Sequence, residues 1–210
     1  MIAESRFSLM RRAAIVTGAA QGIGKSIAKL LAQYGASVVA NDTNMKEAQA
    51  VSNEIRERGG KSTPFKADVS QYKQVRDLFK HAVAEFGTVD ILVNNAGILY
   101  PTRFENITES EWREVIDINL TSVFLCSKEA FLIMKQKRYG KIVNMSSTAA
   151  KTASTFGGAH YTASKSGVSG LTRHLAREGA EYGINVNAVC PGSIDTPMVR
   201  SRATRDAILS

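Results

Sequence analysis

The fold is decided by Ala13–Gly24, which reads AAIVTGAAQGIG. Residues 13–17 form a short apolar run that predicts a buried β-strand, and a helical pattern begins at Ile23. Two glycines lie between the predicted strand and the predicted helix, and a third lies at the start of the helix. A glycine-rich turn in this position between a strand and a helix is typical of dinucleotide binding. Gly18 allows the tight exit from the strand, Gly22 lets the backbone approach a pyrophosphate, and Gly24 lets the helix pack closely on the sheet. The free N–H groups of the helix N-terminus then suit phosphate oxygens.

The same alternation of apolar runs and amphipathic segments continues along the chain. Further strands are predicted at Ser37–Asn41, Ser62–Lys66 (a weaker one, towards the edge), Ile91–Asn94, Lys141–Asn144 and Asn185–Val189. Helices are predicted at Ile23–Tyr34, Lys46–Arg58, Ser70–Phe86 (capped by Ser70), Thr108–Arg138 (opened by a capping box) and Tyr161–Tyr182.

Strand, helix and strand repeated in this way predict right-handed crossovers and a parallel sheet. The expected fold is α/β, a Rossmann-type doubly wound parallel sheet of strand order 3-2-1-4-5-6 in three αβα layers. We found no internal repeat, low-complexity stretch or linker in the 210 residues. Residues 1–210 are therefore expected to form a single dinucleotide-binding domain that carries the active site.

Composition excludes several classes of protein. No window approaches the roughly 20 apolar residues of a membrane span, and residues 1–12 lack a signal-peptide core. Cys126 and Cys190 form no paired framework, which favours a reducing compartment and predicts a cytoplasmic protein. The three histidines lack metal-ligand spacing, so we expect no metal and a structural or exposed place for each. The net charge of +8 is spread over helical faces without an aromatic-basic stripe, so no nucleic acid is expected as a partner.

Asp42 follows the second predicted strand, where a carboxylate can hold both ribose hydroxyls of NAD. The same negative charge repels the 2′-phosphate of NADP. No basic residue follows until Lys46, and Gln21 occupies the loop position where a basic residue would meet that phosphate. The sequence therefore favours NAD as the cofactor. The alternatives are a purely structural glycine turn and an Asp42 that only ends a strand.

Tyr161 and Lys165 lie four residues apart in the last predicted helix. A free tyrosine titrates near pKa ~10, so it acts as a base near neutral pH only when its pKa is lowered. An ammonium one turn along on the same face would favour the phenolate. An isolated pair of this kind is more often a surface pair. Behind a glycine-rich turn it predicts proton transfer beside a bound nucleotide.

Ala13 to about Met198 resembles the short-chain dehydrogenase/reductase family. The resemblance rests on motifs that follow one another in the family's order: Thr17–Gly24, Asp68-Val69, Asn94–Gly97, Asn119, Asn144–Ser147, Tyr161-x-x-x-Lys165 and Pro191–Thr196. Within the family, the pattern is most similar to the 3-oxoacyl-carrier-protein reductase and glucose 1-dehydrogenase types, and no residue chooses between them.

The resemblance implies a role for each matched residue. Tyr161 is then the general acid/base, and Ser147 hydrogen-bonds the substrate oxygen. Lys165 binds the nicotinamide ribose and lowers the pKa of the tyrosine, while Asn119 holds a water of the proton relay. Asp68 and Val69 contact adenine, and Thr196 with the Ile194 backbone fixes the nicotinamide carboxamide. The implied cofactor-binding residues are Gly18, Gln21, Gly22, Ile23, Gly24, Asp42, Asp68, Val69, Asn95, Ala96, Gly97, Tyr161, Lys165, Pro191, Gly192, Ile194 and Thr196.

The sequence departs from the family pattern in two places. The spacing from Ser147 to Tyr161 is one residue longer than usual, so counting back lands on Thr148. We prefer Ser147, aligned on Asn-x-Ser-Ser, with Thr148 as the alternative. The chain is also C-terminally short for the family: Ala203–Leu209 could start the substrate-covering segment, and the final strand is missing. We therefore expect a homodimer through the fourth and fifth helices, Asp117–Lys137 and Tyr161–Tyr182, and not a tetramer.

The expected function is hydride transfer between NAD(H) and a secondary alcohol or ketone. An alternative is a nucleotide-binding protein of the same fold with impaired or no turnover, because the substrate-covering segment is missing. The substrate and the preferred direction are not specified by any residue.

Overall fold

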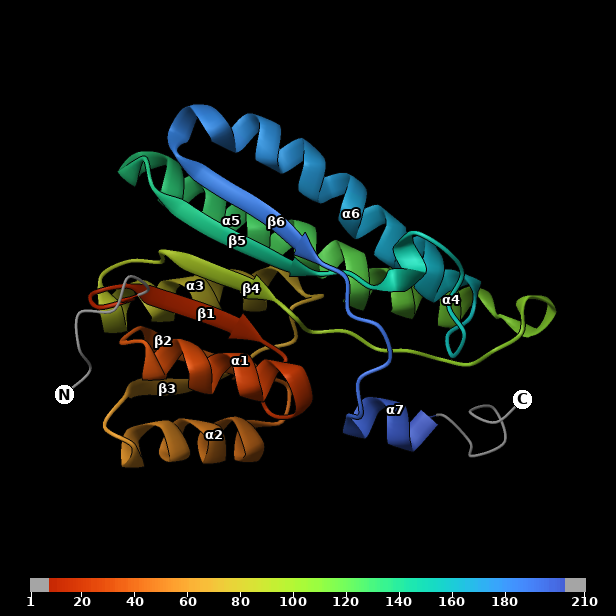
Figure 1. The fold of residues 1–210 in the computed structure, drawn as a ribbon, viewed down its shortest axis with the longest axis horizontal. Coiled ribbons are helices and arrows are strands. Elements are labelled where there is room, and N and C mark those ends of the chain that lie inside the picture. Colours follow the sequence, from red (N-terminus) through yellow and green to blue (C-terminus); the bar gives the residue numbers. More distant parts are fainter. Residues whose placement is uncertain (1–7, 203–210) are drawn as a thin grey trace.

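The computed structural model describes residues 8–202, with side chains up to Arg200. Six parallel strands form one sheet in the order β3-β2-β1-β4-β5-β6 (Figure 1). The strands are β1 (Ala13–Thr17), β2 (Ser37–Asp42), β3 (Lys61–Lys66), β4 (Ile91–Asn94), β5 (Gly140–Met145) and β6 (Ile184–Val189). This confirms the predicted fold class and strand order, including the place of β3 at an edge. The order reverses between β1 and β4, and ligands bind at such a point in open α/β sheets.

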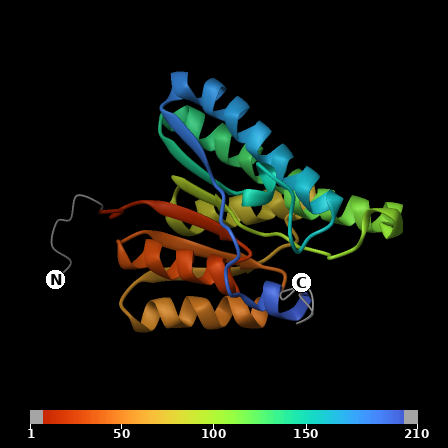
Figure 2. The same ribbon diagram turned by 45° about the vertical axis from the view of Figure 1, so that its right-hand side comes forward.

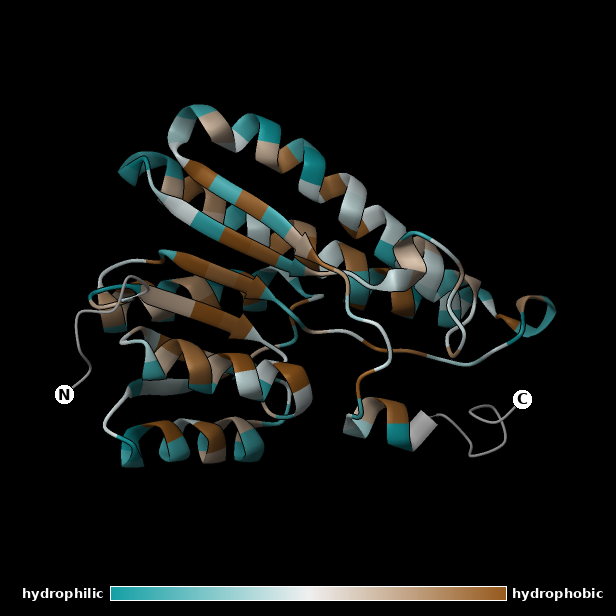
Figure 3. Cartoon of the chain, in the orientation of Figure 1, coloured by the Kyte–Doolittle hydropathy of each residue, from teal (hydrophilic) through white to brown (hydrophobic). Residues whose placement is uncertain are grey.

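The strands bury side chains on both faces of the sheet, which produces two separate hydrophobic cores. On one face, Ala14 and Val16 of β1 pack with α1 (Gly22–Gln33) and α2 (Met45–Glu57). On the other face, Ile15 packs in a core that α3 (Tyr72–Phe86) and α5 (Ser122–Lys137) supply, with α6 (Ala159–Gly179) beside them. Figure 2 shows the helices on either side of the sheet, and Figure 3 shows the apolar residues gathered in the strands. Consecutive buried residues in the central strands β1, β2 and β4 are therefore typical of a sheet covered on both faces.

The predicted single helix over Thr108–Arg138 is interrupted. Thr108 caps α4 (Glu109–Ile116) through a hydrogen bond from Glu111 N–H to its Oγ1, which is one half of the predicted capping box, while the Glu111 carboxylate contacts His160. Asp117–Thr121 then forms one π-helical turn before α5 begins. Such a turn leaves residues out of the usual helical phase and is frequent at functional sites. Here it carries the predicted site residue Asn119.

The prediction that Ser70 caps the third helix was wrong. The helix α3 begins at Tyr72, and the residue before it, Gln71, makes no side-chain cap. The Ser70 hydroxyl instead donates to Asp68 Oδ1 at 2.7 Å, which also accepts from the Ser70 N–H at 2.9 Å. The Asp68 carboxylate accepts the proton of the Ser70 hydroxyl, and the hydroxyl oxygen accepts from Gln71 Nε2 at 3.2 Å in place of a helix N–H.

After β6 the chain leaves the sheet and crosses the carboxyl ends of the strands before the short helix α7 (Pro197–Arg202), as Figure 1 shows. Alternate side chains of β6, Asn185, Asn187 and Val189, are exposed. The predicted start of a substrate-covering segment at Ala203–Leu209 lies outside the described residues.

Two sequence-level features can be placed in the structure. Cys126 is buried and Cys190 is half-buried, and both are free thiols. Between residues 8 and 202, no helix combines the length and the apolar character that crossing a membrane requires.

Candidate active site

The carboxyl ends of the strands open into a cavity of about 480 Å³. It runs from the glycine-rich turn after β1 to the start of α6, along the point where the strand order reverses. Of the predicted site residues, those that line it are Gly18, Gln21, Gly22, Ile23, Asp42, Asp68, Val69, Asn95, Ala96, Gly97, Ser147, Tyr161, Lys165, Pro191, Gly192, Ile194 and Thr196. Gly24 and Asn119 lie behind this lining. The fold therefore brings together residues from nearly the whole chain.

The glycine-rich turn has the backbone that glycine permits. Gly18 and Gly22 adopt φ angles of +62° and +54°, in the left-handed region. A Cβ on Gly24 would meet the Gly18 carbonyl oxygen and lie 2.5 Å from Asn95 Nδ2, so the third glycine is required by close packing. Asn95 holds the turn in place, because its Nδ2 donates to the Thr17 and Gly18 carbonyls at 3.0 Å each.

The N-terminus of α1 suits the pyrophosphate of a dinucleotide. No side chain in the described part of the chain caps this helix, so the N–H groups of its first turn remain available at the cavity wall. The segment after β6 closes on the same point: a Cβ on Gly22 would lie 3.4 Å from Thr196 Cγ2. The residues present therefore fit a nucleotide whose phosphates lie between the turn and Thr196.

Two neighbouring residues lie at the end of the cavity where the sequence predicts the adenosine. The Asp42 carboxylate is half-buried and is held by two backbone donors, Ala20 N–H at 3.1 Å and Asn44 N–H at 3.0 Å. Asn41 was missed in the sequence, yet it lines the cavity with its side chain almost fully buried. Its Nδ2 donates to the Phe65 and Ala67 carbonyls, while its Oδ1 has no partner among the described residues. A buried acceptor left without a donor is costly.

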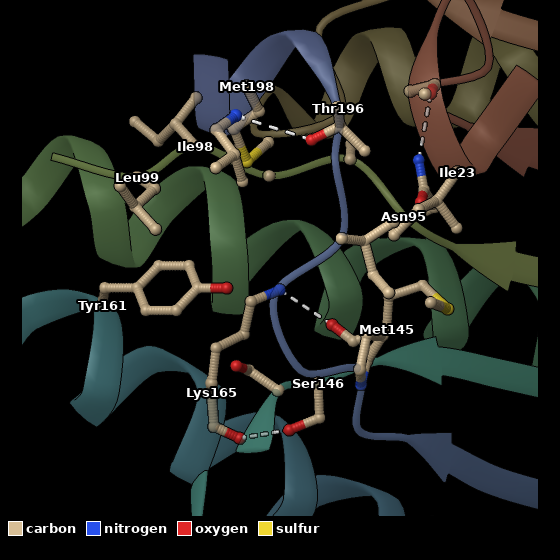
Figure 4. Close-up of a pocket in the computed structure, with 18 of the residues that line it drawn as sticks. Ile23, Asn95, Ile98, Leu99, Met145, Ser146, Tyr161, Lys165, Thr196 and Met198 are labelled. Atoms are coloured by element: carbon tan, nitrogen blue, oxygen red, sulfur yellow. Dashed lines mark hydrogen bonds between the residues drawn. The ribbon is translucent and has the colours of Figure 1, made fainter. Parts of the chain in front are cut away.

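The catalytic candidates meet at the opposite end. Tyr161 and Lys165 point from α6 into the cavity toward the end of β5, as Figure 4 shows. The Lys165 Nζ lies 5.7 Å from the centre of the Tyr161 ring and donates to the Met145 carbonyl at 2.7 Å. Ser147 hydrogen-bonds the Tyr161 phenol, whereas Thr148 is exposed. The Ser147 hydroxyl also accepts from the Ala149 N–H at 3.1 Å, which fixes its direction.

Burial controls the ionisation of this pair. It lowers the pKa of the Lys165 ammonium to about 8. It raises the pKa of the Tyr161 phenol above its usual value, while the hydrogen bond with Ser147 acts in the opposite direction. The prediction that Lys165 lowers the pKa of the phenol is therefore wrong for the protein without a cofactor. The ammonium is directed at the Met145 carbonyl and lies over the ring, so desolvation outweighs its attraction for a phenolate.

Asn119 supports the site from behind. Its Oδ1 accepts from the Ile98 N–H at 2.7 Å, and its Nδ2 donates to the Ile98 carbonyl at 2.9 Å and to Ser164 Oγ at 3.2 Å. Ser164 in turn donates to the Tyr161 carbonyl at 2.7 Å. Both donors of the amide and one of the two acceptor sites of Oδ1 are used, so the role of holding a water stays a prediction for the second acceptor site or the main chain of Asn119. The side chain also joins the segment after β4 to the helix that carries the phenol.

The buried ammonium has a predicted cost in stability. An unfolded lysine titrates near ~10.4, and the folded one at about 8. Between these pH values the unfolded chain binds more protons, so the stability of the wild type rises with pH across this window. We expect Lys165→Met to raise the free energy of unfolding by about 1–3 kcal/mol at pH 7, with a smaller gain at pH 10.

Urea denaturation at the two pH values measures this difference, and Lys66→Met, at an exposed lysine of β3, is the matched control. A loss of stability at pH 7, or a gain that does not change with pH, would contradict the prediction.

Comparisons with known proteins agree with this geometry. A profile of the family described as short chain dehydrogenase matches residues 12–207. The 3-oxoacyl-[acyl-carrier-protein] reductase FabG of Staphylococcus aureus (strain Mu50 / ATCC 700699) is 44% identical over 190 residues, which are 90% of this chain and 77% of that protein. The 3-oxoacyl-[acyl-carrier-protein] reductase of Synechocystis sp. is 40% identical over 195 residues, 92% of this chain and 78% of that one.

Solved structures show the same fold. A short-chain type dehydrogenase/reductase from Mycobacterium marinum superposes with a TM-score of 0.90 at 35% identity, covering 93% of this chain and 78% of that one. A structure described as a short-chain alcohol dehydrogenase from Sinorhizobium meliloti 1021 has a TM-score of 0.87 at 35% identity, covering 91% of this chain and 76% of that one.

Proposed function

The chain belongs to the short-chain dehydrogenase family, and from this premise we propose that it transfers hydride between NAD(H) and a secondary alcohol or ketone. One observation carries the proposal: Tyr161, Lys165 and Ser147 lie at one end of a single cavity that has the glycine-rich turn and Asp42 at the other. A dinucleotide bound along this cavity would present its reactive ring to the phenol. The bound nicotinamide would supply the hydride acceptor or donor.

The side chains of the site transfer the proton of the reaction and hold the substrate and the cofactor in place. Tyr161 exchanges a proton with the substrate oxygen, and Ser147, already bonded to the phenol, orients that oxygen. Lys165 uses one of its three donors on the Met145 carbonyl and has two left for the nicotinamide ribose. Thr196 and the Ile194 backbone, which also line the cavity, are proposed to hold the nicotinamide carboxamide.

The preference for NAD rests on Asp42. Its carboxylate is fixed at the cavity wall by two backbone N–H groups, so it cannot turn away from a 2′-phosphate at low cost. A fixed negative charge there disfavours NADP and accepts hydrogen bonds from ribose hydroxyls.

Part of the cavity lining is apolar. The apolar side chains in it include Ile98, Leu99, Phe156, Met198 and Val199. We therefore propose a carbonyl or alcohol carried on an apolar chain. The curated relatives at 40% and 44% identity are named as reductases of 3-oxoacyl groups on a carrier protein, so 3-oxoacyl thioesters are the first substrates to test.

The test is a screen of NAD(H) and NADP(H) against a panel of 3-oxoacyl thioesters, ketones and secondary alcohols. Turnover with NAD(H) and an apolar carbonyl supports the proposal. Tight binding of NADH, with no turnover across the panel, would favour a nucleotide-binding protein without activity.

Ser147 is the proposed substrate-orienting hydroxyl, and Thr148 is its matched control. We expect Ser147→Ala to lower kcat by about 10²-fold, because a donor to the reacting oxygen is lost. Thr148→Ala should change it less than about three-fold, since Thr148 lines the cavity with an exposed side chain and, of the two, only Ser147 lowers the pKa of the phenol through a hydrogen bond. Steady-state kinetics of the two variants decide the choice. Full activity in Ser147→Ala would move the role to Thr148.

We also propose a homodimer in the cytoplasm. Two large apolar side chains stay exposed along the first of the helices predicted to pair, with exposures of 48% for Phe124 and 54% for Leu132. A second copy of this chain would bury them. Sedimentation should give a dimer, and a stable monomer or tetramer would contradict this assembly. The two free thiols suit a reducing compartment, which cell fractionation tests.

A further inference from the structure

His160 is fully buried and precedes the proposed acid/base in the chain. It lies in the first turn of α6, beside the segment that follows β4 and against α4. The other histidines are more accessible: His174 is exposed and His81 is half-buried. A buried imidazole needs partners for both ring nitrogens, because each unpaired polar atom costs free energy.

Both nitrogens of His160 have partners, and the partners determine its tautomer. The backbone N–H of Tyr161 donates to Nδ1 at 2.9 Å, so Nδ1 carries no proton in this arrangement. Nε2 lies 2.7 Å from Glu111 Oε1. A neutral ring therefore carries its proton on Nε2 and donates it to the carboxylate.

Glu111 is in turn held at its place in α4. A hydrogen bond with the Thr102 side chain, followed by the bond with His160, lowers the pKa of this carboxyl, which stays charged near neutral pH. Thr102 belongs to the segment that follows β4. Gly158 completes the junction: its N–H donates to the Tyr100 carbonyl at 2.8 Å, and a Cβ there would lie 2.7 Å from His160 Cε1.

The chain Thr102–Glu111–His160–Tyr161 N–H thus joins three segments at the base of the phenol. We propose that His160 and Glu111 are positioning residues that set the direction of the Tyr161 side chain toward Ser147 and Lys165. The inference rests on the proposed role of Tyr161 as the acid/base. The physical basis is the geometry of tyrosine. The His160 imidazole binds the backbone N–H of Tyr161, and the reacting Tyr161 hydroxyl lies at the far end of that long, rigid side chain. Small shifts at the backbone become larger displacements of the reacting atom.

The first test replaces His160 by phenylalanine, which keeps a ring of similar shape and removes both nitrogens. We expect kcat to fall about ten-fold, with the Kd of NADH changed less than two-fold. His174→Phe is the matched control, because His174 lies on the same helix and pairs with Glu178 at 2.8 Å on the exposed surface. That variant should keep wild-type kinetics.

Glu111 provides a second variant that leaves the buried ring in place. Glu111→Ala should lower kcat to a similar extent, and Glu111→Gln, which keeps an acceptor for the Nε2 proton, should lie between it and the wild type. Combining Glu111→Ala with His160→Phe should lower kcat no further than either change alone, since both remove one chain of contacts.

A readout independent of turnover separates this inference from the proposed function. The pKa of the phenol is measured by NMR of ¹³C-labelled tyrosine, with the Tyr161 signal assigned by its loss in Tyr161→Phe. Ser147 lowers the pKa of the phenol, so displacing the hydroxyl should move the titration to higher pH in His160→Phe and in Glu111→Ala. Thermal unfolding of each variant shows whether it is folded.

If the wild type shows no turnover, the proposed function is rejected. The titration of the Tyr161 phenol still tests whether His160 and Glu111 orient its side chain. The inference would be overturned if the pKa of the Tyr161 phenol in folded His160→Phe equals that of the wild type. It would also be overturned if His160→Phe loses stability while its kcat stays unchanged. If His160→Phe does not fold, the same two measurements on Glu111→Ala decide it.

Discussion

Replacing Tyr161 by phenylalanine should lower kcat by about 10³-fold or more, while the Kd of NADH stays within about two-fold. The phenol is the ionisable group placed to exchange a proton with a substrate oxygen, and phenylalanine keeps its ring beside Lys165. Because burial raises the pKa of the phenol in the protein without cofactor, alcohol oxidation should accelerate as pH rises. The bound oxidised nicotinamide, a cation, would help to bring that ionisation to lower pH.

The measurement is single-turnover kinetics with NAD and the best substrate of the screen, together with fluorescence titration of NADH. Tyr139→Phe is the matched control, since Tyr139 stacks with Arg12 at 3.9 Å and does not line the cavity. Retained turnover in Tyr161→Phe would remove the phenol from the proposed chemistry.

The second large effect is expected on cofactor preference. Asp42→Asn combined with Thr43→Arg should shift the ratio of kcat/KM for NADP over NAD upward by about 10²-fold. The change removes a fixed negative charge and adds a guanidinium beside the expected 2′-phosphate, because Thr43 lines the cavity next to Asp42. Asparagine keeps an acceptor for one of the two backbone N–H groups that hold Asp42, which limits the loss of stability.

Glu47→Gln serves as the control for charge alone. Glu47 is exposed in the first turn of α2, close to Asp42 in the sequence, and does not line the cavity. Glu47→Gln should leave the ratio of kcat/KM for NADP over NAD unchanged. A wild-type protein that already prefers NADP, or a double variant with the preference for NAD intact, would contradict the assignment of Asp42.

The strands and their order were predictable because their signals are local and repeated. Ala13–Thr17 and Ile91–Asn94 were predicted with the boundaries that the structure has, since unbroken apolar runs bounded by polar residues allow little freedom. The roles of the three glycines in the turn were predictable for a similar reason. A backbone angle at Gly18 and Gly22, and a close approach at Gly24, exclude other residues. The errors came where a side chain had a competing partner, as when Asp68 took the Ser70 hydroxyl.

In the site, too, some features were predictable from the sequence and others were not. Sequence motifs identified the residues that line the cavity, because binding a dinucleotide requires particular residue types at particular strand ends. They did not show that the Asn119 amide hydrogen-bonds Ile98 and Ser164, or that the buried Asn41 side chain has an oxygen with no partner among the described residues. Those facts depend on which segments meet in space.

Residue order alone was enough to establish a doubly wound sheet, a nucleotide-binding turn and a tyrosine–lysine pair, because periodicity, glycine geometry and helical spacing are short-range properties. The ionisation of that pair was decided by the folded chain. Helical spacing predicted that Lys165 lowers the pKa of the phenol, whereas the folded chain buries both groups and turns the ammonium toward the Met145 carbonyl. Desolvation depends on every segment packed around a group, and a distance counted along the chain does not contain that information.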